Sequence, residues 1–319
     1  MIFVVIDSLL LTFYIFIYEY VKKNVFLHFE NNDDTMDPRA ESIGEKYIDL
    51  EKILATKKVK APKFVLRLAE RILHIPELNH GIYLNREYFG LPFVYKFLEG
   101  HDEQDLGVTI SSRGEENIPT EGYPMIVGNH PLGGPDGLAL MGAVGRVRQD
   151  IKFPVNDFLL YLPGLKELFY PIDKVNKTRA LASLEEAFAA ETALLYFPAG
   201  LCSRLQKGEI KDLEWKATFI KKAVRYHRDV VPVFTDARNR MSFYRTAKIR
   251  KALGFKFNFE MALLPAEMYA QRGKTFGITF GKAIPWQTFD QRHTAQEWAQ
   301  MVKEHVYKLK ENPEATFDV

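Results

Sequence analysis

A histidine and an aspartate lie close together in one short loop that is rich in glycine and proline. His130 and Asp136 both fall within Asn-His-Pro-Leu-Gly-Gly-Pro-Asp-Gly, residues 129–137. Histidine is the side chain best suited to accept a proton near neutral pH, and a carboxylate on its other ring nitrogen fixes the tautomer. The pair therefore predicts general-base chemistry.

The residues around this loop indicate how the two side chains meet. The apolar run Pro124–Val127 precedes the loop and is typical of a buried strand. In α/β proteins the chemistry is placed at the carboxyl ends of such strands. Gly133 and Gly134 allow the chain to fold back sharply, which brings Asp136 towards His130.

Taken alone, this segment has a second interpretation without chemistry. Asp136 would cap the helix that follows, while Asn129 and His130 would satisfy hydrogen bonds of the turn. A second apolar run favours the functional interpretation, because residues 193–197 also lead into a Pro/Gly loop, which ends in the cation Arg204.

From residue 108 onward, short apolar strands alternate with helical segments. This pattern predicts an α/β fold, with helices on both faces of a mostly parallel central sheet. Pro232 interrupts one strand, which predicts an edge strand or a bulge beside a cavity. The expected strands are Val108–Ser111, Pro124–Val127, Ala193–Phe197, Val230–Phe234 and Phe276–Phe280, and the expected helices are Leu138–Arg146, Thr178–Glu191, Leu213–Tyr226, Arg240–Ala252 and Ala295–Leu309.

The composition excludes several classes of protein. In 319 residues, 47% are hydrophobic and 26% are charged, which excludes disordered and fibrous proteins. A formal net charge of +2 argues against a dedicated nucleic-acid-binding protein. The one cysteine, Cys202, excludes an internal disulfide and favours a reducing compartment. Neither metal-ligand spacing nor a Walker loop occurs, so no metal site and no nucleotide-driven chemistry are expected.

The chain before residue 106 is expected to associate with a membrane. Residues 1–35 are either an anchor, with an apolar first half followed by two lysines, or sequence translated from a wrong start. Residues 36–105 are expected to be a helical segment at the membrane surface, in which Lys63, Arg67 and Arg71 form one basic stripe. A helix packed on the domain with a solvated basic face fits the same pattern. Residues 106–319 form the remaining domain.

Four segments, in order over roughly residues 107–285, resemble the motifs of the glycerolipid acyltransferase superfamily, which includes the 1-acylglycerol-3-phosphate acyltransferases. That resemblance implies the glycerolipid acyltransferase fold. The matching residues are Asn129, His130 and Asp136 in the first motif, Ile172, Asp173 and Lys174 in the second, Phe197, Pro198, Gly200 and Ser203 in the third, and Val231, Pro232 and Val233 in the fourth.

The departures from the family motifs concern the acceptor. Asp136 follows His130 by six positions, whereas the family motif has five, and the added residue lies in the Gly-Gly-Pro turn. Ala199 and Cys202 replace a Glu and an Arg that help to hold the acceptor's glycerol phosphate in the familiar members. Because a lost guanidinium removes a bidentate phosphate contact, a carboxylate or neutral acceptor fits better. The cations that remain are Lys174, Arg179 and Arg204.

This variant resembles a bacterial hemolysin-like subgroup, similar to the O-acyltransferases that finish ornithine and glycine lipids. The resemblance implies direct acyl transfer without a cofactor. His130, oriented by Asp136, takes the proton of an acceptor hydroxyl, which attacks an acyl thioester of coenzyme A or acyl carrier protein. Backbone N–H groups near Gly133, Gly134 or Gly200 are candidate donors to the oxyanion. The substrate-binding residues implied are Asn129, Gly133, Gly134, Asp173, Lys174, Arg179, Phe197, Pro198, Gly200, Ser203 and Arg204.

Three functions stay open on the sequence. The first is a membrane-associated O-acyltransferase that acts on a lyso-lipid, with a lyso-amino-acid lipid as one candidate. The second is an ordinary 1-acylglycerol-3-phosphate acyltransferase, and the third is a catalytically silent lipid-binding protein on the same fold. The expected partners are a lipid membrane surface and an acyl carrier protein or coenzyme A thioester, at the cytoplasmic face of the inner membrane. The oligomeric state stays open.

Overall fold

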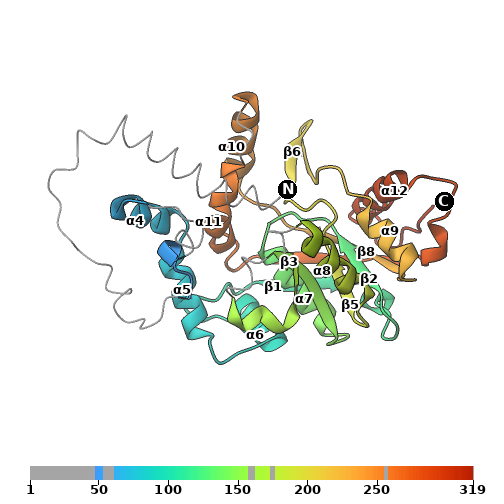
Figure 1. The fold of residues 1–319 in the computed structure, drawn as a ribbon, viewed down its shortest axis with the longest axis horizontal. Coiled ribbons are helices and arrows are strands. Elements are labelled where there is room, and N and C mark those ends of the chain that lie inside the picture. Colours follow the sequence, from blue (N-terminus) through green and yellow to red (C-terminus); the bar gives the residue numbers. More distant parts are fainter. Residues whose placement is uncertain (1–46, 53–60, 157–161, 173–176, 255–257, 319) are drawn as a thin grey trace.

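The structure is a computed structural model, and it describes residues 47–52, 61–156, 162–172, 177–254 and 258–318 (Figure 1). The predicted anchor, residues 1–35, lies outside these described residues. Within them, no helix is long and apolar enough to cross a bilayer. The predicted domain boundary at residue 106 stays a prediction.

The described residues form a central sheet of seven strands in the order β1-β9-β8-β2-β5-β3-β4. Every neighbouring pair is parallel except β8 and β9, which are antiparallel. The predicted α/β class with a mostly parallel central sheet is therefore confirmed. The strands are β1 (Thr109–Arg113), β2 (Met125–Gly128), β3 (Ile151–Asn156), β4 (Phe169–Ile172), β5 (Ala193–Tyr196), β8 (Val230–Asp236) and β9 (Thr275–Phe280).

Helices cover both faces of this sheet, as the sequence predicted. Successive side chains of a strand point to opposite faces, so Ile126 faces one hydrophobic core and Met125 and Val127 face the other. The first core is covered by α6 (Leu91–Glu99) and α7 (Pro135–Gly145). The second is covered by α9 (Thr218–Arg225) and α12 (Ala295–Lys308), which lie together in Figure 1.

The remaining elements lie around this three-layer body. A two-stranded antiparallel hairpin of β6 (Arg204–Gln206) and β7 (Glu209–Lys211) stands apart from the main sheet. The other α-helices are α4 (Lys63–Ile72), α5 (Ile75–Leu84), α8 (Lys177–Ala189), α10 (Met241–Ala252) and α11 (Leu264–Tyr269). The short 3-10 helices are η1 (Glu115–Asn117), η3 (Pro163–Leu168), η4 (Phe259–Leu263) and η5 (Trp286–Thr288).

Pro232 lies in an interior strand, so the alternative of an edge strand is wrong and the alternative of a bulge is right. Strand β8 is bonded to β9 on one side and to β2 on the other. The pair Val233–Phe280 and the bridge Val230–Ile284 differ in register by one residue, which is the signature of a bulge. The proline carbonyl accepts the Gly281 N–H at 2.8 Å. The missing proline N–H thus falls where the β8–β9 ladder is already interrupted.

The predicted helix from residue 213 is wrong in its first residues, because α9 begins only at Thr218. Leu213 and its neighbours instead connect the β6–β7 hairpin to that helix. Buried polar groups fix this connection: the Lys303 ammonium donates to the carbonyls of Asp212 and Leu213 at 2.8 and 2.9 Å. Satisfied backbone carbonyls remove the need for a helix here.

Candidate active site

The predicted contact between His130 and Asp136 is confirmed, and it lies directly after β2. His130 Nδ1 is 2.9 Å from Asp136 Oδ2. Asp136 is fully buried in the first turn of α7, and its carboxylate also accepts the backbone N–H groups of Leu132, Gly134 and Gly137 at 2.9 to 3.0 Å. An ionised carboxylate only accepts, so Nδ1 carries the proton and Nε2 is left as the basic nitrogen.

The surroundings shift the pKa values of the two side chains in opposite directions. Burial alone would lower the pKa of His130, but the charge of Asp136, its hydrogen bond and the charge of Asp212 outweigh burial and raise it. Burial would raise the pKa of Asp136, yet the opposite charge on His130 and the hydrogen bonds of the loop hold it below its ordinary range. Asp136 therefore stays ionised, and His130 is a stronger base than a free imidazole.

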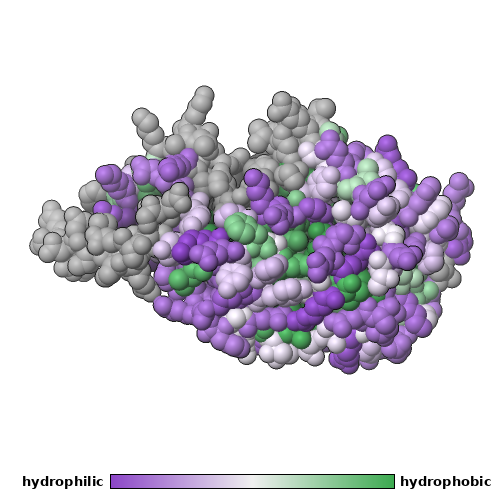
Figure 2. Space-filling view, turned by 90° about the horizontal axis from the view of Figure 1, so that it is seen from below, coloured by the Kyte–Doolittle hydropathy of each residue, from purple (hydrophilic) through white to green (hydrophobic). Residues whose placement is uncertain are grey.

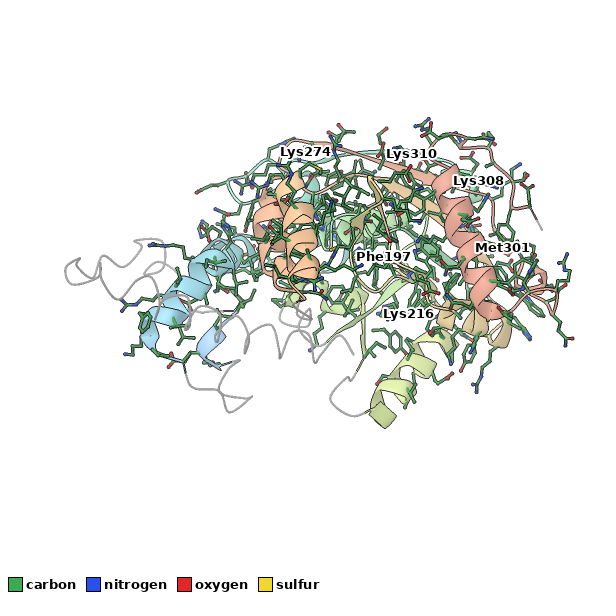
Figure 3. All side chains as sticks on the ribbon, turned by 90° about the horizontal axis from the view of Figure 1, so that it is seen from above. Phe197, Lys216, Lys274, Met301, Lys308 and Lys310 are labelled. Atoms are coloured by element: carbon green, nitrogen blue, oxygen red, sulfur yellow. The ribbon has the colours of Figure 1, made fainter. Side chains whose placement is uncertain are left out.

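Phe197 holds the imidazole in its orientation. The rings of His130 and Phe197 are stacked, with centroids 4.3 Å apart and planes 22° from parallel. Phe153 packs edge-on against Phe197 at 5.2 Å. In the view of Figure 3, Phe197 lies at the centre of the molecule, between the α10–α11 pair and α12. The side chain of His130 remains 17% exposed, so the base keeps access to a bound molecule.

Asn129 and Ser203 form internal hydrogen bonds that hold the site's loops in place. The Asn129 amide donates to the Thr235 carbonyl at 3.0 Å and accepts the Thr235 N–H at 2.7 Å, which ties the loop after β2 to β8. The Ser203 N–H donates to the His130 carbonyl at 2.7 Å. Both residues are buried. Their predicted contact with substrate stays a prediction.

The glycines in the loops after β2 and β5 are explained by backbone conformation and backbone hydrogen bonds. Gly133 has a φ of +90°, and a Cβ there would lie 2.8 Å from Leu264 Cδ1, so only glycine fits without a shift. The Gly134 N–H donates to Asp136 and the Gly200 N–H donates to the Phe197 carbonyl at 3.1 Å. Two of the three amides considered as oxyanion donors, those of Gly134 and Gly200, are therefore already engaged within their loops.

The remaining predicted site residues are placed as follows. Pro198 is buried beside Gly200 in the loop after β5, and its carbonyl accepts the Lys216 N–H at 3.3 Å. Asp173 and Lys174 lie outside the described residues. Arg179 belongs to α8, but its side chain is outside the described part.

Asp212 is a site residue that sequence reasoning missed. Its buried carboxylate accepts the His130 backbone N–H at 3.2 Å, the Ser203 hydroxyl at 2.6 Å and the Trp215 indole N–H at 2.9 Å. Its own N–H donates to the Tyr307 hydroxyl at 2.8 Å. Burial raises the pKa of Asp212, and these donors oppose that shift. The Asp212 carboxylate thus joins both loops of the site, and its backbone N–H ties them to Tyr307 of α12.

Asp212→Asn is expected to lower kcat by about 10–100-fold, because an amide cannot accept all of these donors and the loop holding His130 shifts. Since the Asp212 charge raises the pKa of His130, the rising limb of the pH profile moves to lower pH. Steady-state kinetics across pH, with circular dichroism, checks this. Trp215→Phe, which removes one donor and no charge, is the control that keeps the limb in place. An unmoved limb in Asp212→Asn would contradict the electrostatic role.

Comparisons with known proteins give this geometry its context. Residues 50–316 match the family described as Acyltransferase. The chain is 45% identical over 269 residues to proteins named lyso-glycine lipid O-acyltransferase from Phocaeicola vulgatus and from Bacteroides thetaiotaomicron, covering 82% of this chain and 95% and 97% of theirs. The chain belongs to this acyltransferase family. It is therefore an enzyme. A solved structure, the 1-acyl-sn-glycerophosphate acyltransferase PlsC of Thermotoga maritima, is similar with a TM-score of 0.43 and 17% identity, over 95% of this chain and 96% of that one.

We call residues 197–204, which follow β5, the acceptor loop after the role that the family resemblance implies. This loop differs from the superfamily motif at two buried positions. Ala199 is 6% exposed, and Cys202 is fully buried, with burial raising the pKa of its thiol to about 11. A buried, protonated thiol is a poor nucleophile. Cys202 is therefore not expected to act as a nucleophile in the reaction.

Arg204 is enclosed in an internal ion-pair network. Its guanidinium lies 3.1 Å from Glu260, a fully buried carboxylate that also pairs with Arg250 at 2.8 Å. It also donates to the Cys202 carbonyl at 2.6 Å and lies over the Phe243 ring at 5.2 Å. These contacts give Arg204 a structural role, and its predicted contact with substrate stays a prediction.

Glu260→Ala is expected to lower the free energy of unfolding by about 3–5 kcal/mol, because it leaves two guanidinium groups without their buried carboxylate. Chemical denaturation at pH 7 measures it. The matched control is Glu209→Ala, which removes an exposed partner of Lys211 and is expected to change the free energy of unfolding little. An equal loss of unfolding free energy in the two variants would show that the buried network stabilises the fold no more than an exposed ion pair.

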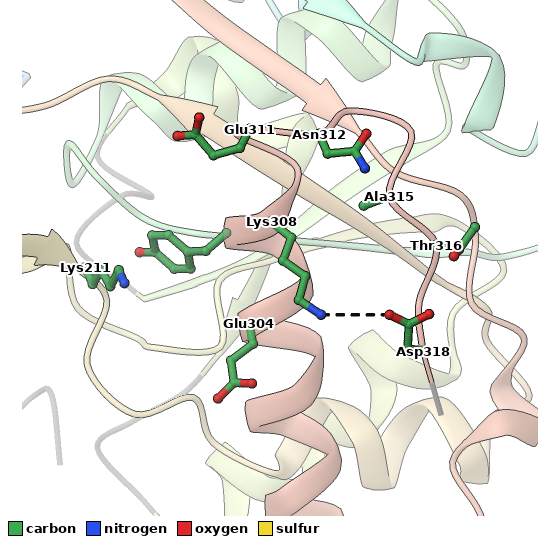
Figure 4. A pocket seen from close by; sticks show the side chains of 9 residues that line it. Lys211, Glu304, Lys308, Glu311, Asn312, Ala315, Thr316 and Asp318 are labelled. Atoms are coloured by element: carbon green, nitrogen blue, oxygen red, sulfur yellow. Dashed lines mark ion pairs between the residues drawn. The ribbon is translucent and has the colours of Figure 1, made fainter.

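A surface groove of about 700 Å³ lies beside α12 and the residues that follow it (Figure 4). Lys211 and Tyr307 line it, and Lys308 and Asp318 face each other across it at 3.9 Å. None of its lining residues belongs to the loop after β2. It is therefore separate from the candidate active site.

Proposed function

We propose that this acyltransferase moves a fatty acyl chain from an acyl thioester to the hydroxyl of a lyso-lipid with an amino-acid headgroup, such as a lyso-glycine lipid. The observation that carries the chemistry is the 2.9 Å contact between His130 Nδ1 and Asp136, which leaves Nε2 as the base. The acceptor is argued from the two relatives of 45% identity. The donor is an acyl carrier protein or coenzyme A thioester.

In this mechanism His130 acts as base and then as acid. Its Nε2 takes the proton of the acceptor hydroxyl while the oxygen bonds to the thioester carbonyl carbon. Collapse of the tetrahedral intermediate breaks the C–S bond, and the imidazolium returns the proton to the leaving thiolate. Asp136 stabilises the imidazolium in between, because it is buried, ionised and fixed by backbone N–H groups.

The acceptor loop supports an acceptor without a phosphomonoester. Small buried side chains stand at Ala199 and Cys202, where the superfamily has a carboxylate and a guanidinium. The remaining cation of the loop, Arg204, is paired with Glu260 inside the protein. A dianionic phosphate needs such cations free for charge-assisted hydrogen bonds, and a single carboxylate needs fewer.

A competition assay with purified protein tests the acceptor. We expect kcat/KM for lyso-glycine or lyso-ornithine lipid to exceed that for lysophosphatidic acid by at least about tenfold, a difference of about 1.4 kcal/mol in transition-state binding. Running each acceptor with acyl carrier protein and with coenzyme A thioesters identifies the donor. A preference for lysophosphatidic acid would refute the proposed acceptor and favour the 1-acylglycerol-3-phosphate acyltransferase alternative.

We also propose that the enzyme works at the cytoplasmic face of the inner membrane, through α4. Val65, Leu66 and Ala69 pack inward, whereas Phe64 and Leu68 are 53% and 37% exposed. Cationic residues flank these exposed apolar side chains along the helix. A basic helix with exposed apolar side chains suits an anionic surface. A chain that starts at Met36 and still fractionates with membranes would support α4 over the first residues as the attachment.

A further inference from the structure

Helix α10 has apolar side chains on two opposite faces. Phe243, Tyr244 and Ala247 are buried and point into the protein. The outward face carries a stripe of large apolar side chains at helical spacing, and its exposure rises along the helix: Met241 is 39%, Ile249 59% and Leu253, at the C-cap, 66% exposed. An exposed apolar stripe on a helix of a soluble domain marks an interaction surface.

The charges on α10 indicate the partner. Arg245 interrupts the apolar stripe and Lys248 borders it, and both are exposed. The helix contains no acidic residue. Apolar side chains bordered by cations match the boundary between acyl chains and anionic headgroups, where lysine and arginine extend their charges to the phosphates.

The position of α10 connects this surface to the candidate active site. Phe243 and Tyr244 pack on Cys202 of the acceptor loop. The amide of Asn239, just before the helix, donates to the Leu132 carbonyl in the His130 loop at 3.3 Å. On the return segment, Leu264 of α11 contacts Gly133.

Helix α10 projects from one side of the molecule. Figure 1 shows α10 (brown) rising above the sheet beside α11, at the top of the view. The opposite side, seen from below in Figure 2, is mainly hydrophilic, with hydrophobic residues only in small separate areas. The arrangement therefore favours the side that carries α10 for contact with lipid.

We propose that the outward face of α10 is a docking site for an anionic phospholipid surface, which it brings against the mouth of the His130 site. The docking itself is argued from α10 alone; its use in presenting a lipid acceptor rests on the proposed function. This site is separate from α4 in sequence and adds a second contact next to the chemistry.

Vesicle co-sedimentation of the full chain tests the docking. The variant Ile249→Glu/Leu253→Glu is expected to bind vesicles containing phosphatidylglycerol about tenfold or more weakly than wild type, because two exposed aliphatic side chains that would enter the lipid become charged. The matched control is Tyr123→Glu, a 46% exposed aromatic just before β2, at the opposite edge of the sheet from the His130 loop. It is expected to bind like wild type. Leu253→Trp gives a second readout, a blue shift of its emission on vesicles and none without them.

The outcomes separate docking from catalysis. Acyl transfer to acceptor in detergent micelles is expected to be unchanged in Ile249→Glu/Leu253→Glu, while transfer to acceptor embedded in vesicles falls. If micellar activity is absent even in wild type, the proposed function fails, and the vesicle data still decide the docking. Wild-type vesicle binding by the double variant would overturn the proposal. So would a wild-type dimer, seen by light scattering, that the double variant converts to monomer with unchanged vesicle binding, because α10 would then face a second copy.

Discussion

Replacing His130 with glutamine is expected to lower kcat for acyl transfer by about 10²–10⁴-fold, the usual contribution of a positioned general base. Glutamine fills a similar space and keeps polar atoms near Asp136, but it cannot take a proton at neutral pH. The substitution also removes the imidazole ring that is stacked on Phe197, so the unfolding of the variant must be measured beside its kinetics. The measurement is single-turnover transfer of a labelled acyl chain to a lyso-lipid acceptor in micelles.

The control for this variant is His101→Gln, which changes an exposed histidine outside the site. It is expected to keep wild-type kcat. Thermal unfolding of both variants separates loss of chemistry from loss of fold. Full activity in His130→Gln, with a folded protein, would show that another group is the base and would sink the proposed mechanism.

Asp136→Asn is expected to lower kcat by about 10²–10⁴-fold through the same imidazole, because the charge that stabilises the imidazolium is lost and the amide can favour the wrong tautomer. The pH dependence gives a sharper readout. In wild type, Asp136 helps to raise the pKa of His130, so the rising limb of kcat/KM lies above the ordinary imidazole value of about 6.5. In Asp136→Asn the pKa falls, so more of the base is unprotonated at low pH and the limb moves to lower pH.

Steady-state kinetics from acidic to neutral pH measures this limb. The matched control is Asp290→Asn, which neutralises a half-exposed carboxylate paired with Arg292. It is expected to change neither kcat nor the position of the limb. A limb that stays in place in Asp136→Asn would mean that the titrating group is not His130.

Much of the fold was predictable because the pattern of hydrophobic residues indicates most of its strands and helices. The strands β2, β5 and β8 are nearly continuous apolar runs, and each predicted helix from residue 135 onward is present. Strands β3 and β4 were missed because Lys152, Pro154 and Pro171 interrupt their apolar pattern, and they lie towards the β4 edge of the sheet. The β6–β7 hairpin was missed for another reason: its turn, Lys207-Gly208, joins strands of only three residues each.

In the candidate site too, contacts between residues close in sequence were predictable, and contacts between distant residues were not. The contact between His130 and Asp136 was predictable because the two residues are joined by one short turn. Residues so close in sequence must also lie close in space. Asp212 was missed because its partner His130 is far away in sequence and no local pattern joins them. Arg204 was predicted to face substrate because the sequence does not show that Glu260 is folded against it.

The order of strands in the sheet also bears on how the chain is made. Among the described strands, β1 is bonded to β9 alone, so Thr109 finds its partner only after Thr275 has left the ribosome. Throughout most of synthesis β1 is an unpaired edge, whereas β2, β3 and β5 can pair as soon as residue 196 emerges. The late strand therefore completes the sheet, and a chain cut short before residue 275 leaves β1 exposed to chaperones and to other nascent chains.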